Sequence, residues 1–209
     1  MEKSVEFYRK INERIKILGI WPTMMYLLFT VFLEKLGFHI DAVFAYKKDD
    51  SSRLAEEKFD FRVIQSLHEL DDKDKISLTE YGGTELIDDF SASFSRGELC
   101  ALGFFEQRLG CICWAKKIQN HPVKIRQSAF LIWRCFTLPD LRGRGLYPLT
   151  LSHFCSMLKN QDSFSGPILI ESSVFNQSSL KGIHKAGFRY KAKVFRFARW
   201  HKTFDIISS

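Results

Sequence analysis

The stretch Thr137-Leu-Pro-Asp-Leu-Arg-Gly-Arg-Gly-Leu-Tyr147 joins the end of a predicted strand to the start of a predicted helix. Its two glycines allow backbone N–H groups to approach an anion without a Cβ in the way, and the helix N-terminus adds unpaired donors. Arg142 and Arg144 add formal positive charge beside these groups. The stretch therefore predicts an anion-binding turn, with an ordinary strand-to-helix loop as the alternative interpretation.

On both sides of this turn, apolar residues recur with the spacing of strands. Strands are predicted over residues 40–46, 59–63, 99–106, 109–117, 128–138, 168–172 and 188–198. The strands 99–106, 109–117 and 128–138 follow one another closely, so antiparallel hairpins are the simplest connection between them. The polar run 47–57 reads as a linker.

Helical spacing of apolar residues separates these strands. The acidic stretch 71–95 is predicted to form two short helices joined at a Gly-Gly pair, and a further helix starts directly after Gly145. Residues 177–186 are predicted to be helical, with Asn176 as the N-cap and Gly187 as the C-terminal stop. The order of elements indicates an α/β protein with a mixed sheet.

Composition indicates one globular domain and a reducing compartment. The chain has 209 residues, 45% of them hydrophobic, which suffices for the core of one domain. Its five cysteines are odd in number and lack paired C-x-x-C spacing, so we predict reduced core thiols and no metal site. The N-terminus shows no small-residue cleavage site, so a secretory signal is not supported. These features predict a cytoplasmic protein.

The net charge of +7 is unevenly distributed. Residues 49–106 are acidic, whereas the C-terminal half carries all of the positive excess. A positive field over one half suits a polyanionic ligand such as nucleic acid, anionic lipid or a phosphorylated cofactor. Basic and aromatic residues alternate from Lys181 to Lys202, which fits either a nucleic-acid surface or an edge strand with charged outward positions.

The N-terminal region predicts a helical extension. Residues 17–33 form an apolar run without a charge, but the run is short for a membrane span and contains Pro22. We therefore expect it to dock on the domain or to lie at the inner face of a membrane, with a true span as the alternative. The predicted division is an extension and linker over 1–57 and the main domain over 58–209.

Two motifs resemble those of the GNAT superfamily of acyl-CoA N-acyltransferases. The stretch Arg142-Gly-Arg-Gly-Leu-Tyr147 resembles R/Q-x-x-G-x-G/A, and residues 176–188 resemble the N-x-x-[AS]…G-F segment. The resemblance covers about residues 58–200. It implies a GNAT-like fold whose central sheet is splayed between the strands 128–138 and 168–172, with the acyl-CoA in that splay.

The resemblance also implies roles for individual residues. Backbone groups of Phe136 and Leu138 would contact the pantetheine, and Asn176 would contact the cofactor arm. The pyrophosphate would be held by Arg142, Gly143, Arg144, Gly145, Leu146 and Tyr147.

Two positions depart from the family pattern. Tyr147 stands where the motif ends in a small residue, and Ile183 stands where a tyrosine often protonates the leaving thiolate. The general acid is therefore unassigned. Glu171, at the end of its strand, is the candidate general base, with a solvated strand-end carboxylate as the alternative. His184 is interpreted as a surface residue, and the cysteines as core residues.

The resulting functional hypothesis is transfer of an acyl group from acyl-CoA to a primary amine on a small molecule. Acetyl, from acetyl-CoA, is the first acyl group considered. The form of the glycine motif, with the N-terminal extension, resembles acyltransferases of surface polysaccharide synthesis, so an amino sugar is the first acceptor considered. No nucleic-acid partner is expected. The alternatives are a nucleic-acid-binding module and a membrane-associated protein whose GNAT fold has lost catalysis.

Overall fold

A computed structural model describes residues 38–47, 58–121, 123, 125, 127–161, 164–199 and 202–208. These residues divide into two compact units. The larger unit is built mainly of Asp41–Val194, and the smaller one includes Phe195–Ile206. All of the site residues predicted from the sequence lie in the larger unit.

The strands form a mixed sheet in the order β2-β3-β4-β5-β6-β1-β7, and β8 follows β7. Their bounds are β1 Phe38–Tyr46, β2 Phe59–Ile64, β3 Leu99–Phe105, β4 Arg108–Ile118, β5 Ala129–Thr137, β6 Ile168–Ser173, β7 Phe188–Arg199 and β8 Lys202–Ser208. Strands β2 to β5 pair antiparallel, as do β6 and β1, whereas β5 and β6 are parallel. The predicted α/β class with a mixed sheet is confirmed. Strand β8 had not been predicted.

Strand β1 lies N-terminal to the predicted domain boundary at residue 58, yet it pairs with β6 from Asp41 to Ala45. Residues on that side of the boundary thus contribute a central strand to the sheet. The boundary itself stays a prediction. Residues 17–33 lie outside the described part of the chain, and within the described part no helix has the length and apolar character needed to cross a membrane.

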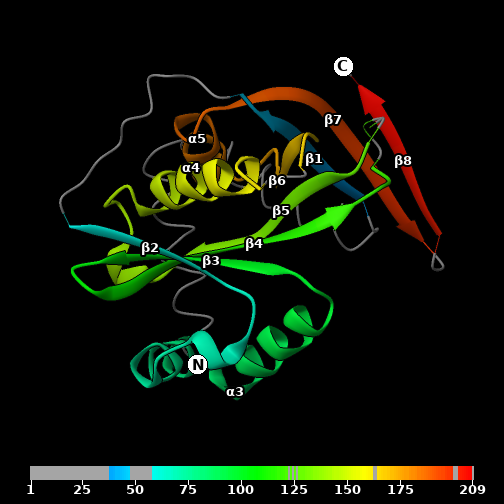
Figure 1. Cartoon of the computed structure of the whole chain (residues 1–209). Helices are drawn as coiled ribbons and strands as arrows, with labels where there is room; N and C mark the ends of the chain where they lie inside the picture. Colours follow the sequence, from blue (N-terminus) through cyan, green and yellow to red (C-terminus); the bar gives the residue numbers. More distant parts are fainter. Residues whose placement is uncertain are drawn as a thin grey trace, which may run out of the picture. The chain divides into compact units, whose positions relative to one another are not determined.

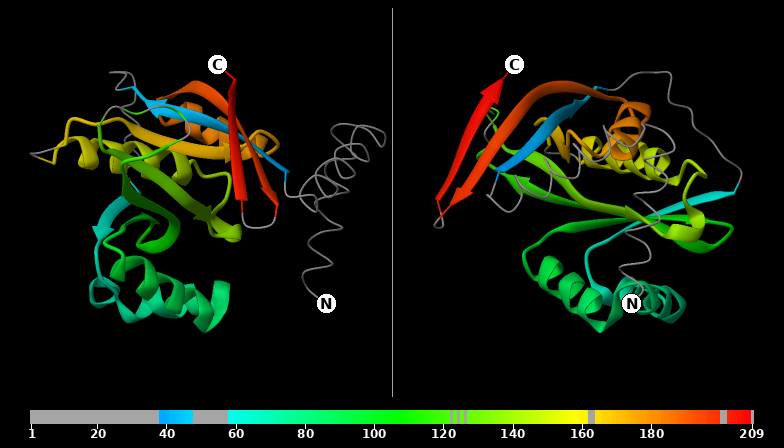
Figure 2. Two further views of the ribbon diagram at one scale, coloured as in Figure 1. Left: turned by 90° about the vertical axis from the view of Figure 1, so that its right-hand side faces the viewer. Right: turned by 180° about the vertical axis from the view of Figure 1, so that it is seen from behind.

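In the described part of the larger unit, three helices accompany the sheet. They are α3 (Asp72–Ser95), α4 (Leu146–Lys159) and α5 (Gln177–Lys185), with the 3-10 turns η1 (Leu67–Glu69) and η2 (Pro139–Leu141). Figures 1 and 2 show α3 on one face of the sheet and α4 and α5 on the opposite face. Both faces are therefore covered by helices, which explains why β3 is apolar along its whole length.

Alternate residues of β4 enter two different cores. Cys111, Cys113 and Ala115 pack in the core beneath α4 and α5. Ile112 and Trp114 pack in the core beneath α3. This alternation follows from the two-residue period of a strand, and it divides the interior into one core for each face of the sheet.

Helix α3 is divided at Gly83, whose φ of 72° and ψ of −177° are not helical. This confirms the prediction of two short helices joined at a Gly-Gly pair. The two segments both reach the core, because Leu78 before the break and Phe90 after it are 0% and 1% exposed. A residue with a Cβ is strained at this φ, so glycine is the residue that permits the break.

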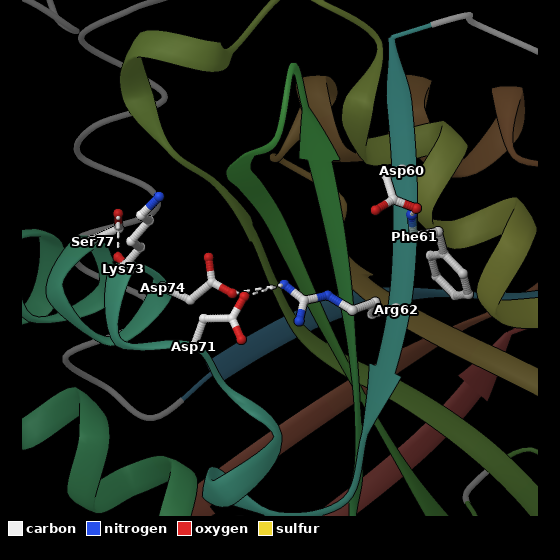
Figure 3. Close-up of polar contacts among 7 residues, drawn as sticks. All are labelled: Asp60, Phe61, Arg62, Asp71, Lys73, Asp74 and Ser77. Carbon is white, nitrogen blue, oxygen red and sulfur yellow. Dashed lines mark hydrogen bonds and ion pairs between the residues drawn. The ribbon is translucent and has the colours of Figure 1, made fainter.

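The start of α3 is tied to β2 by an arginine, as Figure 3 shows. The Arg62 guanidinium lies 2.8 Å from Asp74 and 3.6 Å from Asp71, and it stacks over the ring of Phe104 at 4.4 Å. Burial raises the pKa of Asp74, against the opposing effect of Arg62. The arginine thus offsets part of the cost of burying a carboxylate.

The parallel pairing of β5 and β6 is short. It comprises Phe130 with Ile168, Leu131 with Leu169, and Ile132 with Ile170. Both strands continue beyond this ladder, β5 to Thr137 and β6 to Ser173. The sheet therefore opens between them, at the place where the sequence resemblance implied a splay.

Candidate functional site

The turn between β5 and α4 has a left-handed backbone at both of its glycines. Gly143 has a φ of 80°, and Gly145 has a φ of 76° with a ψ of 2°. Gly145 is also the N-cap of α4, so no side chain caps the first amides of this helix. The turn can thus present backbone N–H groups, together with the positive end of the helix, to an anion.

Both arginines of the turn are exposed, and each is oriented by a contact within the chain. Arg142 Nε donates a hydrogen bond of 3.1 Å to the carbonyl oxygen of Thr137, at the end of β5. The guanidinium of Arg144 stacks over the ring of Phe105, 4.7 Å from its centroid. A planar guanidinium retains further donors in each of these positions.

Two acidic residues lie near this turn. Glu106, whose charge interacts with that of Arg144, forms an ion pair with Lys58. The carboxylate of Asp140, in η2, accepts a hydrogen bond of 2.6 Å from the guanidinium of Arg108. Its charge is paired with a cation on β4. The two turn arginines therefore dominate the local charge.

Strand β5 carries a bulge at the opening of the sheet. Arg134 has a φ of 47°, and the register between β4 and β5 shifts between Ile112 and Trp114. The bulged arginine forms an ion pair with Asp89 of α3. A bulge bends a strand and changes the direction of its backbone groups, and here it does so just beyond the last pair with β6. No glycine marks this position, so sequence reasoning missed it.

The bulge also determines which backbone groups of β5 face the opening. The N–H of Leu138 donates a hydrogen bond of 2.8 Å to the carbonyl oxygen of Gly110 in β4. Antiparallel pairing alternates, so Phe136 faces β4 like Leu138, whereas Cys135 and Thr137 face away from it. The predicted contacts of Phe136 and Leu138 with the pantetheine stay a prediction.

The side chain of Tyr147 is part of the helix packing. Its hydroxyl lies 3.3 Å from that of Ser179, and its ring lies against Gly182 of α5. Burial raises the pKa of this phenol. The hydroxyl of Tyr147 is therefore engaged in the packing of α4 on α5.

Asn176 is the N-cap of α5, as predicted. Its Oδ1 accepts hydrogen bonds from the N–H of Ser179 at 3.2 Å and from the hydroxyl of Ser178 at 2.9 Å. The oxygen thus caps the helix, and the side-chain amide nitrogen is the group of Asn176 that can donate a hydrogen bond to a ligand. Ile183 is fully buried, and His184 is exposed with its ring edge-on to Phe44.

Glu171 is the first residue of β6 beyond the last pair with β5. Its Oε1 lies 3.0 Å from Nε2 of His121, which belongs to the loop between β4 and β5. Sequence reasoning did not select His121, because nothing in its local sequence indicates that it meets a residue fifty positions away. The structure therefore adds a histidine to the candidate base.

The cysteines form no disulfide and are largely inside the protein. Cys135 is partly exposed, and the other four are buried. Burial raises the pKa of Cys100, Cys113 and Cys155, which disfavours their thiolates. Among the described residues, no group of histidine, cysteine and acidic side chains has the arrangement of a metal site.

No protein-family model and no curated protein matches this sequence. A conserved protein of unknown function from Staphylococcus epidermidis matches the structure with a TM-score of 0.52 and 10% identity, over 80% of this chain and 65% of that one. A GNAT-family acetyltransferase from Colwellia psychrerythraea matches with a TM-score of 0.48 and 12% identity, over 82% and 61%.

The fold of this chain is similar to the folds of these solved structures. Glucosamine-6-phosphate N-acetyltransferase from Arabidopsis thaliana is also similar, with a TM-score of 0.43 and 15% identity over 65% of this chain and 94% of that one. The chain spans 61%, 62% and 65% of the lengths of the first three solved structures that it matches. At these low identities, the similarity concerns the fold alone.

Proposed function

We propose that this chain is a GNAT-type, acyl-CoA-dependent N-acyltransferase that transfers an acyl group to a primary amine, with acetyl as the proposed acyl group. One observation carries the proposal: Gly143 and Gly145 are both left-handed in a turn that starts α4 beside the opening between β5 and β6. A diphosphate needs several N–H donors close together, and this backbone offers them without side chains in the way.

The residues around the opening fit the remainder of a CoA molecule. A Cβ at Gly143 would have no neighbour within 4 Å, so this side of the turn has open space for a ligand. Arg142 and Arg144 supply charge for phosphates. The backbone of Cys135 supplies groups for an amide-bearing arm, and Asn176 can meet the arm from α5.

The thioester of an acyl-CoA supplies an activated acyl carbon. Glu171 would then accept a proton from the attacking amine nitrogen as that nitrogen forms its bond to the acyl carbon. The bond between the acyl carbon and sulfur breaks, and the sulfur takes a proton from water and leaves as a thiol. The opening of the sheet aligns the two reactants, which lowers the entropic part of the barrier.

An amino sugar of surface polysaccharide synthesis is our proposed acceptor, and we propose peripheral membrane contact through residues 17–33. Both proposals follow from the sequence. A panel of nucleotide-linked and lipid-linked amino sugars tests the first. For the second, alkaline carbonate should release the full-length protein from membranes, and retention after this wash would contradict peripheral contact.

Binding and turnover test the enzyme proposal separately. Titration calorimetry should show saturable binding of acetyl-CoA, with weaker binding of dephospho-CoA because it has one phosphate fewer. Release of free thiol from acetyl-CoA, measured against a panel of primary amines, should depend on the amine. Binding without any amine-dependent release would instead support a GNAT fold that has lost catalysis, and absence of binding would refute the proposed cofactor.

A further inference from the structure

Glu171, the base of the proposed function, forms a pair with His121. The imidazole is almost completely buried, with 3% of its side chain exposed, whereas the side chain of Glu171 is 20% exposed. Nε2 of the histidine lies 3.0 Å from Oε1 of the glutamate. The glutamate is therefore the member of the pair that solvent or a ligand can reach.

A second hydrogen bond defines the protonation of the imidazole. The backbone N–H of Val123 lies 3.1 Å from Nδ1 of His121 and can only donate. Nδ1 must therefore present a lone pair. In the neutral ring the proton is then on Nε2, which donates it to the carboxylate of Glu171.

This tautomer excludes the opposite assignment of roles. A histidine that acted as the base would need a lone pair on the nitrogen that faces the reactants. Here the lone pair of Nδ1 is engaged by Val123, and Nε2 carries a proton toward Glu171. A carboxylate has about four lone-pair positions, so the hydrogen bond from His121 does not use all of the acceptor capacity of Glu171.

We propose that His121 is a positioning residue that orients Glu171 and favours its charged form for removal of the acceptor proton. The proposal rests on the proposed function and deepens it. His121 itself does not contact the reactants. Its hydrogen bond holds one carboxylate oxygen at the first residue of β6 beyond the ladder with β5, so the carboxylate does not rotate among several rotamers.

Two substitutions that differ by one methylene test this role. In His121→Asn, the amide oxygen can take the place of Nδ1 and keep the bond from Val123, but the side chain is too short to reach Glu171. In His121→Gln, the amide nitrogen can take the place of Nε2 and restore the donor. Circular dichroism and thermal unfolding establish that each variant is folded.

We expect His121→Asn to lower kcat roughly 10-fold, the effect of losing a hydrogen bond to a charged group, while the KM for acetyl-CoA stays unchanged. The acidic limb of the kcat/KM profile should move to higher pH, because the lost hydrogen bond favoured the ionised carboxylate. His121→Gln should restore most of kcat and return the limb toward its original position. A purely structural histidine would lower stability without moving this limb.

Combination with Glu171→Gln makes the test specific. If His121 acts only through Glu171, then His121→Asn causes no further loss of kcat in the Glu171→Gln protein. An equal loss in both backgrounds, or wild-type kinetics in His121→Asn, overturns the proposal. Failure of the wild type to bind acetyl-CoA or to acylate any amine overturns the proposed function as well, so the two failures are distinguishable.

Discussion

The ring of Tyr147 in α4 packs directly on the α-carbon of Gly182 in α5. A Cβ at Gly182 would lie 2.4 Å from Cδ1 of the tyrosine, far inside contact distance. Gly182 is buried, and the ring cannot easily turn away because its hydroxyl meets Ser179. The absence of a side chain at this glycine therefore allows the first turn of α4 to approach α5.

Gly182→Ala should consequently destabilise the protein by about 1–3 kcal/mol, measured by urea unfolding, as expected for overpacking. Alanine is the better helix former by about 1 kcal/mol, so the collision has to exceed that gain. The control is the same substitution in a Tyr147→Ala background, where it should be neutral or stabilising. Equal destabilisation in both backgrounds would show that the tyrosine is not the cause.

Gly143→Ala separates the ligand role of the turn from its conformational strain. Gly143 and Gly97 have φ values of 80° and 72°, and a Cβ at either would have no neighbour within 4 Å. Each alanine variant should lose about 1–2 kcal/mol of stability from its positive φ. Only Gly143→Ala should also weaken acetyl-CoA binding, by roughly 10-fold or about 1.4 kcal/mol, because the strained alanine displaces the backbone N–H groups of the turn. Calorimetry that finds equal affinities in the two variants would argue against the turn as the phosphate site.

Arg144→Gln removes charge from the turn and leaves its backbone intact. The affinity for acetyl-CoA should fall about 5-fold at low salt, and the loss should shrink at higher salt because ions screen the exposed charge. Lys159→Gln is a matched control at the last residue of α4. Fourteen residues of helix span about 21 Å, which is about two Debye lengths at 0.1 M salt but less than one at 0.01 M, so the two variants are compared at about 0.1 M salt. A similar loss of acetyl-CoA affinity in Lys159→Gln would indicate that Arg144 acts only through the overall positive charge of the protein.

Glu171→Gln tests the candidate base while preserving the shape of the side chain. The rate of amine-dependent thiol release should fall roughly 100-fold or more, with little change in the affinity for acetyl-CoA. Glu80→Gln provides the control, because Glu80 is an exposed carboxylate on α3. An active Glu171→Gln enzyme with an unchanged pH profile would leave deprotonation to an ordered water.

Arg62→Leu should destabilise the protein at neutral pH, because it leaves the buried Asp74 without its nearest cation. Fully buried pairs lose about 3–5 kcal/mol in this way, but the Arg62 side chain is 37% exposed, so about 1–2 kcal/mol is expected. Asp74→Asn should lower the free energy of unfolding by less, because the side chain of Arg62 still reaches solvent and Asp71.

The same pair predicts a dependence on pH. Since burial raises the pKa of Asp74, the folded state binds its proton more tightly than the unfolded chain does. Stability is thus lost as the pH rises from the ordinary range of aspartate, near 4, through the raised value. The deficit of Arg62→Leu relative to wild type should therefore shrink between pH 7 and about pH 4. A deficit that grows on acidification would contradict this account.

Local sequence was sufficient for much of the fold and for the turn. Asn176 caps α5 through the N–H of Ser179, and Gly143 and Gly145 adopt positive φ where α4 begins. Such features depend on residues within a few positions of one another, so their signals survive in a single sequence. The break of α3 at Gly83 follows the same rule.

Other features required distant partners. The bulge at Arg134 arises from the register of β5 against β4. The contact of His121 with Glu171 joins residues fifty positions apart. Sequence periodicity reports which face of a strand is apolar, but strand register and loop contacts depend on how the whole sheet assembles, so only the tertiary structure specified them.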